Sequence, residues 1–229
     1  KIATKADITA SNTHLQLKSW IRMVNIMANV QKILKGLKNV HFAKWNGDGY
    51  EAPVPIKYAK KIENTLNYET DSDWADDEIV SVENGFSGGE GTLNTLGLLA
   101  EEQTLLFGSK KVPGGIVVKS DDMAPTGAFL FERKKKESTA RRLYVVYACK
   151  CSPASFGGET IEEGKGASEE SEISYSISEN SEHGIFYFID TDATDAPKSQ
   201  VENWYKEVQF PTEPVVSASS RSKKTEKGE

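Results

Sequence analysis

Short apolar segments separated by turn-forming residues make up most of the chain from Gly36 onward. Most connections between them are too short for a helical crossover, which indicates antiparallel pairing of strands. The clearest strand pattern sets Ile173, Tyr175 and Ile177 between serines, so we expect one face of that strand to be buried and the other wet. The pattern therefore predicts a mainly β, antiparallel fold.

An opening hairpin is predicted from residues 37–45, a turn at 46–49 rich in Asn, Gly and Asp, and a return through 54–56. Residues 185–189 are apolar throughout, as expected of a strand covered on both sides. The remaining strand candidates are residues 92–96, 115–118, 128–133 and 143–148.

Two helices interrupt this pattern. Residues 98–107 predict a short helix that ends at Gly108, whose missing Cβ permits a left-handed cap. A final helix is predicted with Asp195 as its cap and Pro197 in its first turn, ending before Pro211. Its apolar stripe is Val201, Trp204, Tyr205 and Val208.

A long acidic excursion is predicted at about residues 64–91. Its glycine cluster, residues 85–91, lacks the Gly-Lys-Ser/Thr of a phosphate loop, and Glu90 would repel phosphate. We therefore interpret the cluster as a flexible hairpin tip.

The chain is expected to form one β domain over residues 27–211, since a single core commonly serves ~100 to 200 residues. Residues 1–26 are interpreted as a leader or an over-extended start, with the native protein beginning at Met27. Residues 212–229, rich in Ser, Lys and Glu, are predicted to be a flexible polar tail.

The formal net charge of -6 argues against duplex DNA as a tightly bound ligand, and leaves DNA possible as a passing cargo. No run approaches the ~20 apolar residues of a membrane span, so no membrane insertion of this chain is expected.

No metal site, cofactor or catalytic set is predicted. Cys149 and Cys151 would lie on one face of a strand, where a disulfide would be strained, so reduced structural thiols are expected. Asp190, Asp192 and Asp195 resemble the start of a calcium loop but lack its central Gly and terminal Glu, which favours turn formation and helix capping. We therefore expect the chain not to be an enzyme.

The densest basic cluster, residues 133–136 with Arg141 and Arg142, falls at a predicted hairpin end. It is either a solvated turn or a socket for an acidic surface on a neighbouring copy, such as residues 71–78.

Several strings, in their order, resemble the major tail protein family of long non-contractile-tailed phages. Trp74-Ala75-Asp76-Asp77 resembles the family's acidic loop, with Asp77 in place of the usual Asn. The other matching strings are residues 36–43, 105–108, 128–132 and 142–147 and the pair Trp204-Tyr205, so that the resemblance covers residues 27–211.

This resemblance implies a β-sandwich or partly closed barrel with a short flanking helix, a C-terminal helix and extended arms. It implies a subunit of a virion tail tube, assembled in the host bacterial cytoplasm. Six copies would form a ring, and the rings would stack around transiting double-stranded DNA. The implied partners are further copies of the chain, a tape measure protein, and tail terminator and tip proteins. Lumen-facing residues are not assigned.

The candidate contacts between subunits or rings follow from the acidic excursion and the basic cluster. They are Tyr68, Asp71, Asp73, Trp74, Asp76, Asp77, Phe86, Arg133, Lys134, Arg141 and Arg142. A monomeric β-sandwich module that binds carbohydrate or acts as an adhesin is the alternative, with Trp45, Tyr50 and Trp74 lining its groove. A hydrolase on a β scaffold would need a pocket of convergent carboxylates.

Overall fold

The structure is a computed structural model that describes residues 32–75, 78–153 and 170–212. The predicted leader, residues 1–26, and the predicted tail beyond residue 212 lie outside the described residues.

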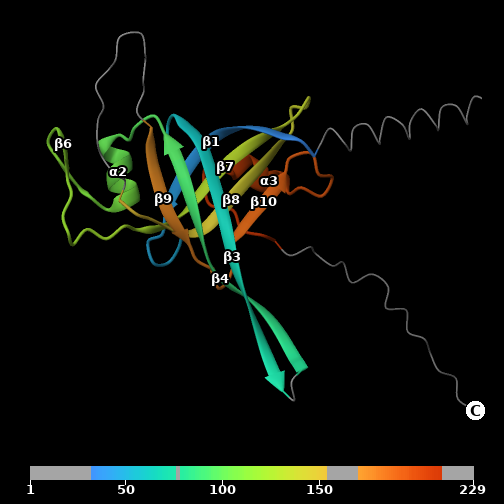
Figure 1. Cartoon of the computed structure of the whole chain (residues 1–229). Coiled ribbons are helices and arrows are strands. Elements are labelled where there is room, and N and C mark those ends of the chain that lie inside the picture. The colour runs from blue at the N-terminus through green and yellow to red at the C-terminus, as the bar shows by residue number, and fades with distance from the viewer. Residues whose placement is uncertain (1–31, 76–77, 154–169, 213–229) are drawn as a thin grey trace, which may run out of the picture.

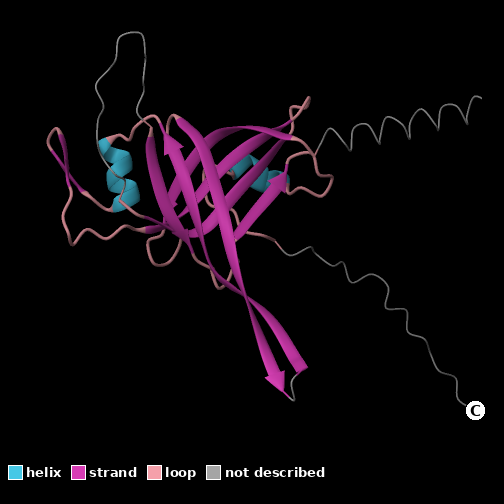
Figure 2. Ribbon diagram, viewed as in Figure 1, coloured by secondary structure: helices cyan, strands magenta, loops and turns pink. Residues whose placement is uncertain are grey.

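Within that part of the chain, strands and two short helices follow one another (Figures 1 and 2). The strands are β1 (Leu34–Lys44), β2 (Val54–Pro55), β3 (Ala59–Ala75), β4 (Glu78–Thr95), β5 (Lys110–Val112), β6 (Gly115–Val117), β7 (Thr126–Lys135), β8 (Arg141–Cys151), β9 (Ser171–Ile177) and β10 (Phe186–Asp190). The helices are α2 (Ala100–Phe107) and α3 (Lys198–Asn203).

One antiparallel sheet holds eight of these strands, in the order β2-β1-β7-β8-β9-β4-β3, with β10 also paired to β8. The sheet curls until β1 and β3 approach each other without pairing. β5 and β6 form a separate small hairpin beside α2 (Figure 2). The predicted mainly β, antiparallel fold is confirmed, as an incompletely closed sandwich with two short helices.

The face enclosed by the curl, called the inner face, packs the larger core. Helix α2 contributes Leu106 and Phe107 to it. The predicted alternation of β9 is confirmed, because Ile173, Tyr175 and Ile177 are all buried here. The other main members are Val40, Phe42, Phe129, Phe131, Val146, Cys149 and Cys151.

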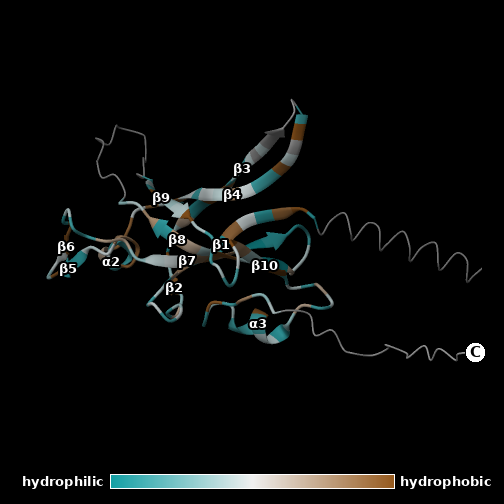
Figure 3. Cartoon of the chain, turned by 90° about the horizontal axis from the view of Figure 1, so that it is seen from below, coloured by the Kyte–Doolittle hydropathy of each residue, from teal (hydrophilic) through white to brown (hydrophobic). Residues whose placement is uncertain are grey.

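The opposite face, called the outer face, is covered by α3 and the segment after it. Figure 3 shows α3 on the side of the sheet away from β3 and β4. Trp204 and Val208 pack there, as the predicted stripe requires. The sheet contributes Ala43, Ala128, Leu130, Leu143, Val145, Tyr147 and Ile189.

Strand β8 serves both cores through side-chain alternation, and a bulge reverses which of its positions face each core. Before the bulge, Leu143, Val145 and Tyr147 face the outer core. Ala148 then adopts a positive φ of 47°, and Cys149 and Cys151 face the inner core. The register with β7 shifts at the same point, as expected where one strand holds an extra residue.

Several local predictions can be compared with this fold. The opening hairpin is confirmed, with Phe42 opposite Val54. Helix α2 ends at Gly108, which has a φ of 74°, as predicted. The predicted cap of the final helix is wrong: the residue at the N-cap is Pro197, and Asp195 lies in the turn before it. The helix itself is shorter than predicted and continues as turns from Trp204.

Candidate functional site

The predicted acidic loop at residues 64–91 is instead a long two-stranded hairpin, formed by β3 and β4. Its strands pair from Ala59 opposite Thr95 to Ala75 opposite Glu78. β4 pairs with β9 only from Gly89 to Thr95, so the rest of the hairpin projects from the body of the sheet (Figure 1). Its many Asp, Asn and Gly residues have low strand propensity, so the sequence alone did not indicate this pairing.

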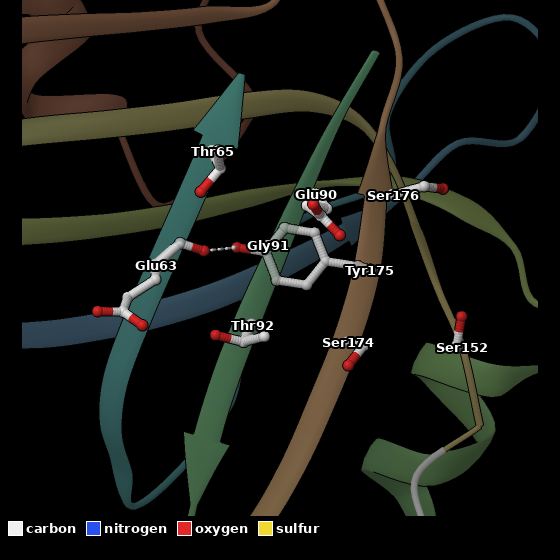
Figure 4. A pocket seen from close by; sticks show the side chains of 9 residues that line it. All are labelled: Glu63, Thr65, Glu90, Gly91, Thr92, Ser152, Ser174, Tyr175 and Ser176. Carbon is white, nitrogen blue, oxygen red and sulfur yellow. Dashed lines mark hydrogen bonds between the residues drawn. The ribbon is translucent and has the colours of Figure 1, made fainter. Parts of the chain in front are cut away.

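The glycine run is not the hairpin tip that the sequence suggested, because it lies within β4. Gly91 sits directly opposite Tyr175 of β9, and a Cβ there would collide with the tyrosine ring. Figure 4 shows that ring crossing β4 toward β3, where its hydroxyl donates to Asn64 Oδ1 at 2.6 Å. The glycine therefore lets one side chain tie three strands together. Burial raises the pKa of Tyr175, which keeps this hydroxyl a donor.

An open groove over these strands is lined by hydroxyls and by two carboxylates, Glu63 and Glu90 (Figure 4). The Glu63 carboxylate lies 2.8 Å from Lys61 Nζ. The lining residues of this groove include no His or Cys that could act with them as a nucleophile–base pair.

Candidate contact residues of the hairpin lie along its projecting part. Tyr68 and Phe86 are directly opposite each other, with ring centroids 5.7 Å apart, and Tyr68 is 59% exposed. Backbone pairing places Asp71 opposite Glu83, Asp73 opposite Ser81 and Trp74 opposite Ile79. The side chains of these three residues, and all of Asp76 and Asp77, lie outside the described residues.

The projecting hairpin has two different faces. Leu66 packs against the inner core, and side-chain alternation along β3 puts Tyr68 and Thr70 on that same face. On β4, Phe86 lies opposite Tyr68 and Asn84 lies opposite Thr70, whose Oγ1 donates to Asn84 Oδ1 at 2.6 Å. Val82, which is 56% exposed, lies opposite Ser72. This uncharged inner face of the hairpin continues the core face of the sheet beyond the body. Glu69 and Glu83 are exposed at the alternate positions.

Part of the predicted basic socket is neutralised within the chain. Arg142 donates to both carboxylate oxygens of Asp190, from Nε at 2.8 Å and from a terminal nitrogen at 2.7 Å. These hydrogen bonds raise the pKa of Arg142 and lower the pKa of Asp190. Lys135, only 5% exposed, lies 2.6 Å from Asp192 and 3.2 Å from Asp190. Asp190, at the end of β10, and Asp192, in the turn after it, therefore neutralise buried or half-buried cations, a role that the sequence did not indicate.

Arg141 is also engaged, since it lies 3.0 Å from the buried Glu132 carboxylate. Arg133 donates to the backbone carbonyl of Leu34 at 3.3 Å. Lys134 is exposed and stands opposite both Lys35 and Arg141. Among the described residues, neither Arg133 nor Lys134 has a carboxylate partner within ion-pair distance.

Within one chain, the hairpin and the basic turn are not brought together. Figure 1 shows the hairpin leaving the body in one direction and the β7–β8 turn pointing away from it. The proposed pairing of these charges therefore requires two copies.

The prediction that the strand at 185–189 is covered on both sides is wrong. Phe186 and Phe188 are 46% and 41% exposed, while Ile189 is buried. β10 pairs with β8 along one edge, and the described residues provide no strand for its other edge. A continuous apolar run indicates a strand but does not show which of its faces is covered, so this exposed pair was missed.

Cys149 and Cys151 are buried, unpaired thiols on the inner face, as expected from their spacing. Over the described ranges, no three His, Cys, Asp or Glu side chains gather in a way that could hold a metal ion. No helix in the described part of the chain is long and apolar enough to cross a membrane.

Comparison with known protein families and with curated proteins finds no match for this chain.

Proposed function

We propose that the chain is a structural subunit that assembles with copies of itself into stacked rings, forming a tail tube of the phage type through which double-stranded DNA passes. Its place is then the virion tail, after assembly in the host bacterial cytoplasm. Its partners are its own copies, a tape measure protein, and tail terminator and tip proteins.

The observation that carries this proposal is the projecting hairpin. An isolated two-stranded hairpin is at best marginally stable in water, and this one presents Tyr68 and Val82 to solvent on a face that continues the core. A surface of this kind is expected to be covered in the working assembly. Each of β3 and β10 has one edge that no strand in the described part of the chain pairs with, and this supports the same conclusion, because exposed strand edges favour pairing with other chains.

The alternative binding module is less well supported. Trp45 and Tyr50 pack edge to face against each other, with centroids 4.9 Å apart, and the Tyr50 hydroxyl accepts from the backbone nitrogen of Ala148. Both side chains are half-buried instead of forming an open aromatic platform. They also belong to the β1–β2 connection, whereas Trp74 belongs to the far end of the hairpin.

Sedimentation velocity and negative-stain microscopy of the purified chain at rising concentration test the proposal. We expect rings and tubes to replace monomers as concentration increases. A chain that remained monomeric across concentration, salt and temperature would refute self-assembly and favour the binding module.

A further inference from the structure

Two parts of the inner face have no cover among the residues that the structure describes. The first is the uncharged inner face of the hairpin, which carries Tyr68, Phe86 and Val82. It begins where β9 ends, since Ile177 pairs with Gly89 and no residue of β9 lies beside the rest of β4. The core face thus continues beyond the body of the sheet with no second layer over it in residues 32–75, 78–153 and 170–212.

The second uncovered part is the exposed side of β10. Phe188 is opposite Tyr144, whose ring centroid lies 5.9 Å away, and Tyr144 packs against the inner core. Phe186 extends the same aromatic row at 6.5 Å from Phe188. The guanidinium of Arg142 lies over the Phe188 ring, 4.4 Å from its centroid. This aromatic row therefore runs from the core to an unpaired strand edge.

We propose that the inner face of the hairpin of one copy packs on the Phe186 and Phe188 face of β10 in the next copy. The inference rests on the proposed assembly and names the two surfaces that make its contact. Because the two surfaces differ, the contact is head-to-tail, and repetition of such a contact produces a closed ring or an open filament.

Charge favours β10 over an exposed apolar surface near α2, which includes Leu99, Val118 and Met123. The projecting segment, residues 66–88, has no Lys or Arg; its carboxylates are Glu69, Asp71, Asp73, Asp76, Asp77, Glu78 and Glu83. The region near α2, residues 96–124, is close to neutral: its charged residues are Glu101, Glu102, Lys110, Lys111, Lys119, Asp121 and Asp122.

Beside β10, by contrast, residues 133–142 contain one carboxylate, Glu137, against the cations Arg133, Lys134, Lys135, Lys136, Arg141 and Arg142. Arg133 and Lys134 are the two whose charge no described carboxylate pairs. Glu69 and Glu83 stand at the alternate positions of the two strands that make the contact, so packing of the hairpin on this face brings their charges toward the basic turn.

A charge-swap experiment on the full chain tests the pairing. The hairpin variant carries Glu69→Lys with Glu83→Lys, and the basic-turn variant carries Arg133→Glu with Lys134→Glu. We expect each variant alone to assemble at least about tenfold less than the unchanged chain, because like charges then face each other. An equimolar mixture should recover assembly, since the two variants can alternate. Reversed hairpins then meet reversed turns, and unchanged hairpins meet unchanged turns.

The apolar part of the contact has a matched control. Phe188→Ser should reduce assembly, whereas Met123→Ser, at a side chain 75% exposed near α2, should leave it unchanged. Circular dichroism and thermal melting of each monomer establish that the variants fold.

The outcomes separate this inference from the proposed function. If the unchanged chain forms rings but the folded swap variants also assemble alone, or fail to assemble when mixed, the proposed function survives and this contact is refuted. Loss of assembly with Met123→Ser but not with Phe188→Ser refutes it as well. If the unchanged chain never assembles, both proposals fail together.

Discussion

The ring of Tyr175 on β9 lies across Gly91 on β4, and its hydroxyl reaches Asn64 on β3. We expect Gly91→Ala to force the buried ring aside, because the new Cβ would occupy its place. Crowding of this kind costs about 1–3 kcal/mol of unfolding free energy, which urea denaturation measures.

Gly85→Ala is the control for this change. Gly85 lies in the projecting part of the same strand, and a Cβ there meets no atom within 4 Å. If Gly91→Ala and Gly85→Ala lowered the unfolding free energy equally, the clash between a Cβ at position 91 and the Tyr175 ring would be refuted.

Protonation of Asp190 should weaken the fold at low pH. Its hydrogen bonds with Arg142 lower its folded-state pKa, so the folded protein binds this proton less tightly than the unfolded chain does. The stabilisation is therefore present above the unfolded pKa, about 3.9, and is lost as pH falls through the folded value. Asp190→Asn should cost about 1–3 kcal/mol at neutral pH.

Denaturation of Asp190→Asn and the unchanged chain from about pH 7 down to pH 2 checks this prediction. The difference in unfolding free energy should shrink below about pH 4. Asp195→Asn, at an exposed position with no contact to Arg142, should show little difference at any pH. A penalty for Asp190→Asn that did not vary with pH would contradict the assigned role of its charge.

Both thiols should resist chemical labelling in the folded protein. Burial raises the pKa of the Cys149 thiol, and raises that of Cys151 to about 12, so almost no reactive thiolate exists near neutral pH. A thiol reagent should modify both residues rapidly in the denatured protein and far more slowly in the folded protein. Rapid native labelling would mean that the inner core opens readily at this end of β8.

Shortening the hairpin should separate folding from assembly. A variant in which an Asn-Gly turn replaces residues 69–85 keeps the Tyr68 and Phe86 pair and all pairing of β4 with β9. Its unfolding free energy should change by less than about 1 kcal/mol, because the described residues of the removed segment belong to neither core. It should nevertheless remain monomeric in sedimentation; tube formation by this variant would exclude the hairpin as a connector.

Strong local patterns predicted the elements that carry them. The alternation around Tyr175 indicated a half-buried strand, and the apolar run closed by Gly108 indicated α2 with its left-handed end. Both signals depend on neighbouring residues alone. The opening hairpin was predictable for the same reason, since its turn residues lie between its two strands.

Features that depend on distant residues were not predictable in this way. The acidic hairpin forms paired strands although many of its residues have low strand propensity. Asp190 pairs with Arg142, from which it is separated by 48 positions in the sequence. The exposure of Phe188 depends on which other elements cover its face of β10, which the residues of β10 do not indicate. Of the predicted contacts, Tyr68 and Phe86 meet within the chain, while Arg141 and Arg142 have partners of their own.

Strand β8 makes the two halves of the molecule inseparable. A single continuous strand supplies side chains to the hydrophobic interior on each side of the sheet, so neither interior can form while the other is absent. Heat or denaturant should therefore melt the chain in one step, and no cut within that strand could yield two fragments that fold independently.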